Sequence, residues 1–289
     1  MKRVLIAGST GKIGSFLVKA LASDYAVYTV SRQRSGINNF RYDFDSQSGD
    51  LTPLRNIRFE AIIFCIGILP SSNLSKEAFD KINSKSVGVL AQHVNRKCKF
   101  IFMSSISVYG ESIVDRTISE SDKVSPKNLY AKSKLEGEIL SRESFKTCYI
   151  FRVPPVYTDF NDKTIYKRIV KNKLFEIKFG DDTQLHSFCS LQNLSVIIKQ
   201  FSDNHYEEGI FHVADREVLS SKDLKDKLKF KPLVVFKFPK WAFESILLFF
   251  NVLNIRLVKN KVNEIYFKLF CSNIYSTDKI LDQIERKVR

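Results

Sequence analysis

The stretch that decides the fold is VLIAGSTGKIGSFLVKALASDYAVYTVSR, residues Val4 to Arg32. Its first four residues are apolar, which is typical of a buried parallel strand. The turn from Gly8 to Gly14 follows at once, then an apolar series at helical spacing, and Ala26 to Val30 predicts a second strand. A strand, a glycine turn, a helix and a strand within about thirty residues predict a nucleotide-cofactor site.

The glycines of such a turn have distinct physical roles. One permits a tight bend, another lets the backbone approach a pyrophosphate, and a third lets the helix pack against the strand. The N-terminus of the helix then offers unpaired N–H groups and a positive dipole end to the phosphates. A plain structural turn is the alternative interpretation, and the position between strand and helix favours cofactor binding.

Length and composition indicate a folded globular protein. The chain has 289 residues, 44% of them hydrophobic, which allows one large α/β domain or a domain with a smaller lobe. The five cysteines are odd in number and contain no CxxC pair, so we expect no disulfide and no metal site. A reducing compartment, the cytoplasm, is therefore predicted. We expect no signal peptide, because the first strand already begins at Val4.

The net charge of +15 is compatible with several partners. The lysines and arginines are spread along the chain without a basic block, so no nucleic-acid partner is predicted. An anionic substrate and an anionic membrane surface both suit a diffuse positive field. The charge alone does not decide between them.

The end of the second strand indicates which dinucleotide binds. An enzyme that selects NAD usually has an acidic residue there for the ribose 2′-hydroxyl, whereas this chain has Ser31 and Arg32, with Arg34 close by. A hydroxyl and guanidinium groups suit a 2′-phosphate. NADP is therefore the favoured cofactor and NAD the alternative.

The following segments alternate between strands and helices. We predict strands over residues 39–44, 61–66 and 100–103, and a helical pattern over 75–94. This alternation predicts an α/β fold with a doubly wound parallel sheet.

The segment SPKNLYAKSKLEGEIL, residues 125–140, predicts a helix that Pro126 can start. Tyr130 and Lys134 are four residues apart, so they share one face of this helix. The lysine charge can lower the phenol pKa, and a serine from the neighbouring strand end could hold a substrate oxygen. A solvated tyrosine and lysine on a surface helix are the alternative.

Three motifs together resemble one protein family. They are the N-terminal GxxGxxG, the strand end SSISVYG at residues 104–110, and the YxxxK at residues 130–134. This set resembles the extended short-chain dehydrogenase/reductase superfamily, in particular its epimerase/dehydratase branch that acts on nucleotide sugars. The resemblance implies a Rossmann core over residues 1–157. It also implies a small C-terminal substrate-binding lobe, mainly residues 158–289, with some segments returning to the core sheet.

The resemblance also implies site residues. Tyr130 is the expected acid/base, Lys134 the residue that binds the nicotinamide ribose, and Ser105 the catalytic serine, with Ser104 as its close rival. Substrate contacts are expected at Ser105, Ser107, Tyr130 and His186. Asp43 is expected to meet the adenine. The remaining expected cofactor contacts are Gly8, Thr10, Gly11, Lys12, Ile13, Gly14, Ser31, Arg32, Ile66, Gly67, Ser104, Pro154 and Val156.

Two departures from the family pattern bear on the reaction. The family's dehydratases carry an acidic residue at the strand end, and none lies between Met103 and Gly110, which disfavours dehydration. His186 and Asn193 stand where an arginine and an aspartate are usual, and a histidine can still donate a hydrogen bond but carries less charge at neutral pH. The alternative for His186 is a surface residue on a strand.

The last third of the chain is the hardest to align. We expect a helix over 163–178, a strand over 208–214, a helix capped by Ser220 or Ser221, and a last helix after residue 276. The apolar segment 241–258 is too short between its charges to span a bilayer. Packing against the lobe is its favoured role, and membrane-surface or subunit contact is the alternative. The resemblance also implies homodimerisation through the helices around Ser84 and Tyr130.

Three functions follow. The first is an NADP-dependent reductase of a 4-keto nucleotide sugar, with a nucleotide-diphosphate sugar as substrate, serving surface polysaccharide synthesis by family-level inference. The second is a nucleotide-sugar 4-epimerase with bound NAD. The third is a non-catalytic dinucleotide-binding relative, which the presence of both Tyr130 and Lys134 disfavours. Membrane-surface docking, with the protein peripheral to the inner face of the membrane, could coexist with activity.

Overall fold

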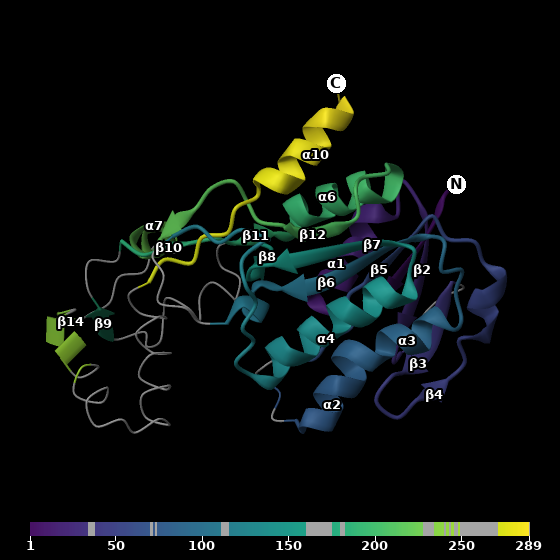
Figure 1. Ribbon diagram of the computed structural model, residues 1–289, viewed down its shortest axis with the longest axis horizontal. Helices are drawn as coiled ribbons and strands as arrows, with labels where there is room; N and C mark the ends of the chain where they lie inside the picture. Colours follow the sequence, from purple (N-terminus) through teal and green to yellow (C-terminus); the bar gives the residue numbers. More distant parts are fainter. Residues whose placement is uncertain are drawn as a thin grey trace.

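An eight-stranded sheet forms the centre of the protein (Figure 1). The computed structural model describes residues 1–33, 38–69, 72, 74–110, 116–159, 175–179, 183–227, 234–239, 241–242, 244–245, 248 and 271–288. The sheet runs in the order β12-β7-β6-β5-β1-β2-β3-β4, and all neighbours are parallel except β3 and β4. Its strands are β1 (Arg3–Ala7), β2 (Ala26–Ser31), β3 (Asn39–Asp43), β4 (Ser48–Gly49), β5 (Ala61–Phe64), β6 (Lys99–Ser105), β7 (Thr147–Val153) and β12 (Gly209–His212).

Helices cover both faces of this sheet (Figure 1). One face carries α1 (Lys12–Leu21), α6 (Leu191–Asp203) and α10 (Asp278–Val288), and the other α2 (Lys76–Asp80), α3 (Ser86–Ala91) and α4 (Leu129–Ser144). Strand residues alternate between the faces, so Ile101 and Met103 of β6 join the first core, and Phe100 and Phe102 the second. Both cores are apolar, which explains why the central strands read as continuous hydrophobic runs.

The doubly wound parallel sheet is confirmed. From β1 the chain builds the sheet in one direction through β2 and β3, and it then continues on the other side of β1 with β5 and β6. In open α/β sheets, ligands bind at the carboxyl ends of the strands beside such a reversal. The glycine turn after β1 and the serines at the end of β6 therefore lie along the edge where a cofactor site is expected.

The predicted helix over 75–94 is interrupted. The π-helical segment η2 (Lys81–Lys85) separates α2 from α3, and α3 ends at Ala91. Such π turns insert an extra residue into a helix and are frequent at functional sites. The start of α4 also differs from expectation. Asn128, and not Pro126, is the N-terminal cap, because its side chain accepts a hydrogen bond from the Ala131 N–H at 2.9 Å.

Later parts of the chain rejoin the main sheet. The predicted strand over 208–214 is β12, which pairs with β7. Ser220 caps α7 (Ser221–Lys227), since its hydroxyl accepts from the Asp223 N–H at 3.0 Å. Outside the main sheet, short strands pair in twos: β8 (Val156–Tyr157) with β11 (Cys189–Ser190), β10 (Leu185–His186) with β13 (Leu219–Ser220), and β9 (Phe175–Phe179) with β14 (Val234–Phe238).

Some predictions fall partly outside the described residues. The expected helix over 163–178 is wrong at its end, where β9 is a strand, and residues 163–174 lie outside the described part. Most of segment 241–258 also lies outside it. The domain boundary at 157 stays a prediction. No helix within the described ranges combines the length and apolarity needed to cross a bilayer. The five cysteines are free thiols, as expected.

Candidate functional site

The turn after β1 has the geometry of a phosphate cradle. Gly8 has a φ of 89°, and a Cβ there would lie 2.8 Å from the Cys65 carbonyl carbon. A Cβ on Gly14 would collide with the Gly8 carbonyl, so α1 packs against the turn only because residue 14 is glycine. The Gly11 N–H donates to the Gly8 carbonyl at 3.1 Å and closes the turn. These residues fit a dinucleotide pyrophosphate, which needs close backbone approach and the N-terminus of a helix.

Lys12 connects this turn to the segment after β7. Its Nζ donates to the Val156 carbonyl oxygen at 2.8 Å. Pro154 is buried and Val156 is half-buried at the start of β8, while Thr10 is exposed and Ile13 packs partly against the core. The structure therefore brings the turn residues and the Pro154–Val156 segment together.

The end of β2 carries no carboxylate in its described residues. The buried Ser31 hydroxyl hydrogen-bonds to the Gln33 backbone, and Arg32 is exposed. Arg34 lies outside the described residues. Arg41 of β3 is the register partner of Ser31, so it adds a guanidinium at this edge. Sequence inspection missed Arg41, because only the strand register brings it beside Ser31.

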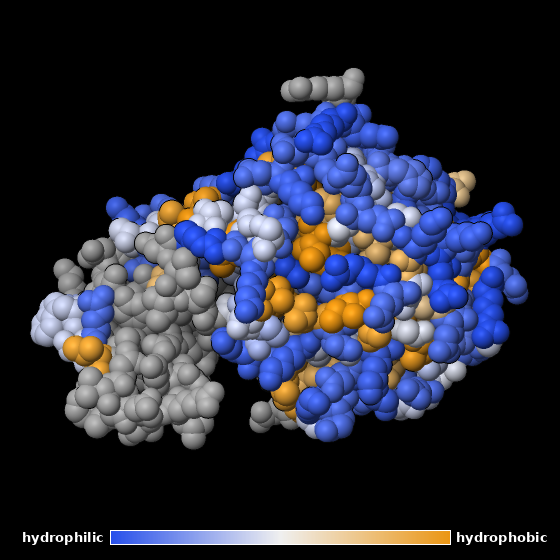
Figure 2. Space-filling view, viewed as in Figure 1, coloured by the Kyte–Doolittle hydropathy of each residue, from blue (hydrophilic) through white to orange (hydrophobic). Residues whose placement is uncertain are grey.

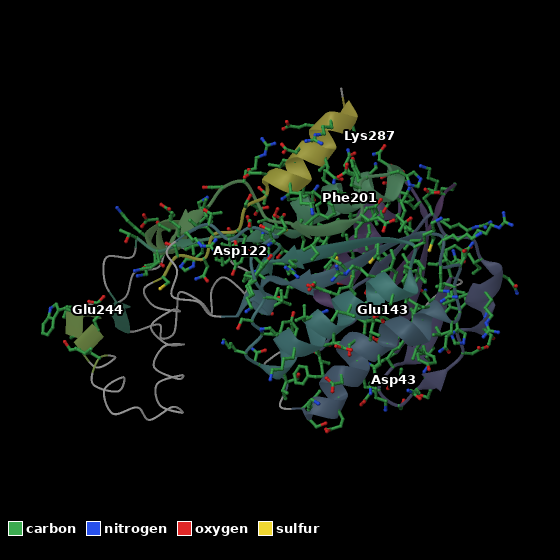
Figure 3. All side chains as sticks on the ribbon, in the orientation of Figure 1. Asp43, Asp122, Glu143, Phe201, Glu244 and Lys287 are labelled. Atoms are coloured by element: carbon green, nitrogen blue, oxygen red, sulfur yellow. The ribbon has the colours of Figure 1, made fainter. Side chains whose placement is uncertain are left out.

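Asp43 lies at the end of β3, as predicted (Figure 3). Its carboxylate accepts a hydrogen bond from the Asp45 N–H at 2.9 Å, an Asx turn that fixes the side chain. The predicted adenine contact stays a prediction.

The candidate catalytic residues converge at the end of β6. Ser105 ends the strand and caps the 3₁₀ turn η3 (Ile106–Tyr109), accepting from the Ser107 N–H at 3.2 Å and the Ser107 hydroxyl at 3.0 Å. The Tyr130 phenol of α4 lies near the Ser105 hydroxyl, close enough for that hydroxyl to lower the phenol pKa. Tyr130 and Ser105 are thus neighbours through tertiary structure, although 25 residues separate them in the chain.

Lys134 lies one turn further along α4 and is buried. Its Nζ donates to the Met103 carbonyl at 2.9 Å and the Ile66 carbonyl at 3.4 Å. Burial lowers the pKa of Lys134 to about 8, and the neighbouring Cys65 and Glu138 partly oppose that shift. Lys134 is therefore a buried amine that titrates close to neutral pH.

The expectation that Lys134 lowers the Tyr130 pKa is wrong for this structure. Burial raises the pKa of Tyr130, and the hydrogen bond from Ser105 offsets part of the rise. The phenol therefore stays protonated at neutral pH, which suits a proton donor.

The two rival serines have different partners. The buried Ser104 hydroxyl donates to Oε1 of Glu138 at 2.5 Å, whereas Ser105 contacts Ser107 and Tyr130. Strand alternation explains this, because Ser104 shares the α4 face with Phe102. The geometry favours Ser105 as the residue that meets a substrate oxygen.

Asn83 is a site residue that sequence inspection missed. It is fully buried in η2, where its Oδ1 accepts from the Ile68 N–H at 2.7 Å and its Nδ2 donates to the Ser133 hydroxyl at 2.9 Å. A Cβ on Gly67 would lie 3.1 Å from Lys134 Nζ. Asn83 therefore holds the Ile66–Ile68 segment over the lysine. The available signal was that Asn83 lies four residues from both Phe79 and Val87, on the apolar side of the predicted helix.

His186 lies in β10, apart from the end of β6 (Figure 1). Its Nε2 forms a hydrogen bond with the Ser221 hydroxyl at 3.3 Å. Its predicted substrate contact stays a prediction. Among the described residues, no cluster of histidine, cysteine and carboxylate side chains could hold a metal ion.

Comparison with known proteins identifies a family and several relatives that match large parts of this chain. The family model described as "RmlD substrate binding domain" matches residues 1–228. The UDP-glucose 4-epimerase of Vibrio cholerae is 27% identical over 269 residues, which are 84% of this chain and 80% of the epimerase. The dTDP-4-dehydrorhamnose reductase of Salmonella typhimurium is 26% identical over 159 residues, 53% of this chain and 51% of that enzyme.

Solved structures share the fold. The dTDP-4-dehydrorhamnose reductase of Bacillus anthracis, in complex with NADP, has a TM-score of 0.65 at 21% identity and covers 84% of this chain and 86% of its own. The UDP-glucuronic acid 4-epimerase of Bacillus cereus, in complex with NAD, has a TM-score of 0.68 at 18% identity and covers 98% and 92%. The predicted resemblance to extended short-chain enzymes of nucleotide sugars is confirmed.

Proposed function

Because this chain belongs to the RmlD substrate-binding domain family, an NAD(P)-dependent group, we propose that it is an NADP-dependent reductase of a 4-keto nucleotide sugar. One observation carries the proposal: Ser105, Tyr130 and Lys134 converge at the end of β6, beside a glycine turn that fits a pyrophosphate. The family's nucleotide-sugar relatives supply the substrate class. We further propose a role in surface polysaccharide synthesis, in the cytoplasm.

The chain's own residues have separate tasks in this reaction. The turn of Gly8, Gly11 and Gly14 would hold the pyrophosphate, and a bound NADPH supplies the hydride. The protonated Tyr130 phenol donates a proton to the substrate oxygen as it gains charge, while Ser105 donates a hydrogen bond to the same oxygen. The Lys134 ammonium, held against two backbone carbonyls, keeps the surroundings of that oxygen positive.

The end of β2 supports NADP. Arg32 and Arg41 provide guanidinium groups near Ser31, and residues 30–33 contain no carboxylate that would repel a 2′-phosphate. Titration calorimetry of the cofactor-free protein should show at least tenfold preference for NADPH over NADH, about 1.4 kcal/mol.

A 4-epimerase is the second candidate, because the Vibrio cholerae epimerase matches 84% of this chain. Preference for NADH, or NAD that co-purifies and resists removal, would favour it. If neither dinucleotide binds, both enzyme candidates are refuted.

Activity is tested with a panel of 4-keto nucleotide sugars by NADPH absorbance. We expect Tyr130→Phe to lower kcat by at least about 100-fold with unchanged NADPH affinity, because only the proton donor is lost. Tyr28→Phe is the matched control, since the Tyr28 ring packs against Phe40 and Phe59. Equal activity of the two variants would refute the role of Tyr130.

A further inference from the structure

Three polar residues follow one another along a single face of α4. Tyr130, Lys134 and Glu138 are spaced by four, so each lies one turn beyond the last. Two of them face the end of β6: the Tyr130 phenol lies near the Ser105 hydroxyl, and Lys134 Nζ donates to the Met103 carbonyl at 2.9 Å. The third contact belongs to Glu138, which the proposed reaction does not use.

Glu138 is fully buried and joins three elements. Its Oε1 accepts from the Ser104 hydroxyl at 2.5 Å and from Arg152 Nε at 2.9 Å, and its Oε2 accepts from Arg152 Nη2 at 2.7 Å. Two parallel bonds between a guanidinium and a carboxylate fix orientation as well as distance. The helix α4 is thus held to β6 by Ser104 and to β7 by Arg152.

The same network supports the turn after Ser105. Arg152 Nη1 donates to the Tyr109 hydroxyl at 2.8 Å, and that hydroxyl lies 2.6 Å from His212 Nε2 on β12. Tyr109 ends η3, the turn that Ser105 begins. Ser105 therefore lies between two segments that are both anchored to the Glu138–Arg152 pair.

We propose that Glu138 is a positioning residue of the reaction, which acts through Ser104 to set the register of α4 against the end of β6. That register determines the separation between the Ser105 hydroxyl and the Tyr130 phenol. The proposal rests on the proposed function, because the register matters only if these two oxygens share a substrate atom. Misplacement by about 1 Å can cost about 100-fold in rate.

A purely structural ion pair is the competing explanation. A buried ion pair is weak evidence for stability, since burial costs both charges their hydration. The hydrogen bond to Ser104 is the distinguishing feature, because a stabilising pair with Arg152 alone would not require it. Removal of that hydroxyl leaves the ion pair intact, whereas Glu138→Gln removes the charge opposite Arg152 and disturbs the fold. Ser104→Ala is therefore the decisive variant.

The control lies on the same helix. Ser141 is fully buried on α4, and its hydroxyl donates to the Gly137 carbonyl of the same helix at 2.6 Å. Ser141→Ala thus deletes an equally buried hydroxyl without touching the contact between α4 and β6. Ser104→Thr keeps the hydroxyl at position 104 and serves as the conservative rescue.

We expect Ser104→Ala to lower kcat about tenfold or more with KM and the NADPH Kd unchanged, because the Ser104 hydroxyl is buried against Glu138 and the predicted cofactor contact of Ser104 is left to its backbone. Ser141→Ala should keep the wild-type kcat, and Ser104→Thr should regain most of the lost rate. Wild-type kcat in Ser104→Ala, or an equal loss in both alanine variants, would overturn the proposal. A parallel loss of NADPH affinity in Ser104→Ala would also overturn the proposal, as would a Ser104→Thr variant that does not regain kcat.

The wild type is measured first, so that the two proposals fail separately. If it binds NADPH but reduces none of the keto sugars, the proposed reductase is refuted. Crystal structures of the wild type and Ser104→Ala then decide the positioning role. A Ser105 to Tyr130 oxygen distance that changes by about 0.5 Å or more supports it, and an unchanged distance overturns it.

Discussion

At the scale of single residues, the buried amine of Lys134 makes the free energy of unfolding depend on pH. Its pKa falls from 10.5 to about 8 on folding, so between those values the unfolded chain binds more protons than the folded one. Below about pH 8 the cost of burying the charge is fully present, and it is relieved as the pH rises to about 10.5.

We therefore expect the free energy of unfolding of the wild type, relative to Lys134→Met, to rise by roughly 3 kcal/mol across that window. Urea unfolding of both proteins at pH 7, 8, 9 and 10 measures the difference. The comparison cancels the titration of other groups. A difference that does not change with pH would contradict the shifted pKa.

Residue identity alone predicted much of the site. The motif pair SSISVYG and YxxxK selected Ser105, Tyr130 and Lys134, which the fold brings together. The direction of the Tyr130 pKa was not predictable, because burial depends on neighbours that are distant in the chain. The choice between Ser104 and Ser105 likewise required the position of Glu138.

At the scale of elements, the π turn η2 has a specific role. Asn83 satisfies both backbone groups of Ile68, accepting from its N–H at 2.7 Å and donating to its carbonyl at 3.3 Å. Loss of the amide leaves these part-buried groups without that partner. We expect Asn83→Ala to lower the free energy of unfolding by about 2–3 kcal/mol.

Urea unfolding measures this, with Asn95→Ala as control. Asn95 is exposed and its side chain only accepts from the Lys97 N–H, so we expect a change within about 0.5 kcal/mol. Calorimetry should also show weaker NADPH binding in Asn83→Ala, since the Ile66–Ile68 segment is a proposed cofactor contact. Equal stability of the Asn83→Ala and Asn95→Ala variants would refute the stabilising role of Asn83.

Element boundaries were predictable where local signals are strong. The pattern around the glycine turn located β1 and β2 within one residue of their observed bounds and predicted a helix between them. The helical pattern over 75–94 did not reveal η2, because a single five-residue step between Ile82 and Val87 is a weak signal within an otherwise helical spacing. Asn128 outcompetes Pro126 as the start of α4 through a side-chain hydrogen bond that spacing does not reveal.

At the scale of the whole molecule, the core includes residues far beyond 157. Phe211 of β12 is fully buried and packs edge-on against Phe151 and Phe201, with ring centroids 6.3 and 5.3 Å away. Phe201 lies on α6 (Figure 3), and its ring is buried in the core between this helix and the sheet. We expect Phe211→Ala to lower the free energy of unfolding by about 3–5 kcal/mol.

Val196→Ala is the control, since Val196 is 51% exposed on α6 and should change stability by less than about 0.5 kcal/mol. Urea unfolding, followed by near- and far-ultraviolet circular dichroism, gives both values. A loss below about 1 kcal/mol in Phe211→Ala would show that β12 is not part of the cooperative core.

The doubly wound parallel sheet was predictable from the alternation of strands and helices, whereas the surface properties were not predictable from composition. Figure 2 shows a mostly hydrophilic face with hydrophobic patches near its middle. Leu129 and Ile139 of α4 are exposed apolar residues. The predicted homodimer would cover this helix, and it stays a prediction, as does membrane-surface docking. Both depend on partners, which a single chain does not specify.

The position of β12 has a consequence for synthesis on the ribosome. β7 lacks its outer neighbour β12 until residue 212 has emerged from the ribosome. The Ile210 carbonyl on β12 gains its hydrogen bond from Lys279 Nζ, at 2.9 Å, only after residue 279 has been added. Translation from residue 153 to 212 takes about 3–12 s at about 5–20 residues per second. Throughout that interval β7 is an unpaired edge strand, the feature by which chains aggregate. Holdase chaperones that shield strand edges would therefore raise the yield of this protein during its synthesis more than after release.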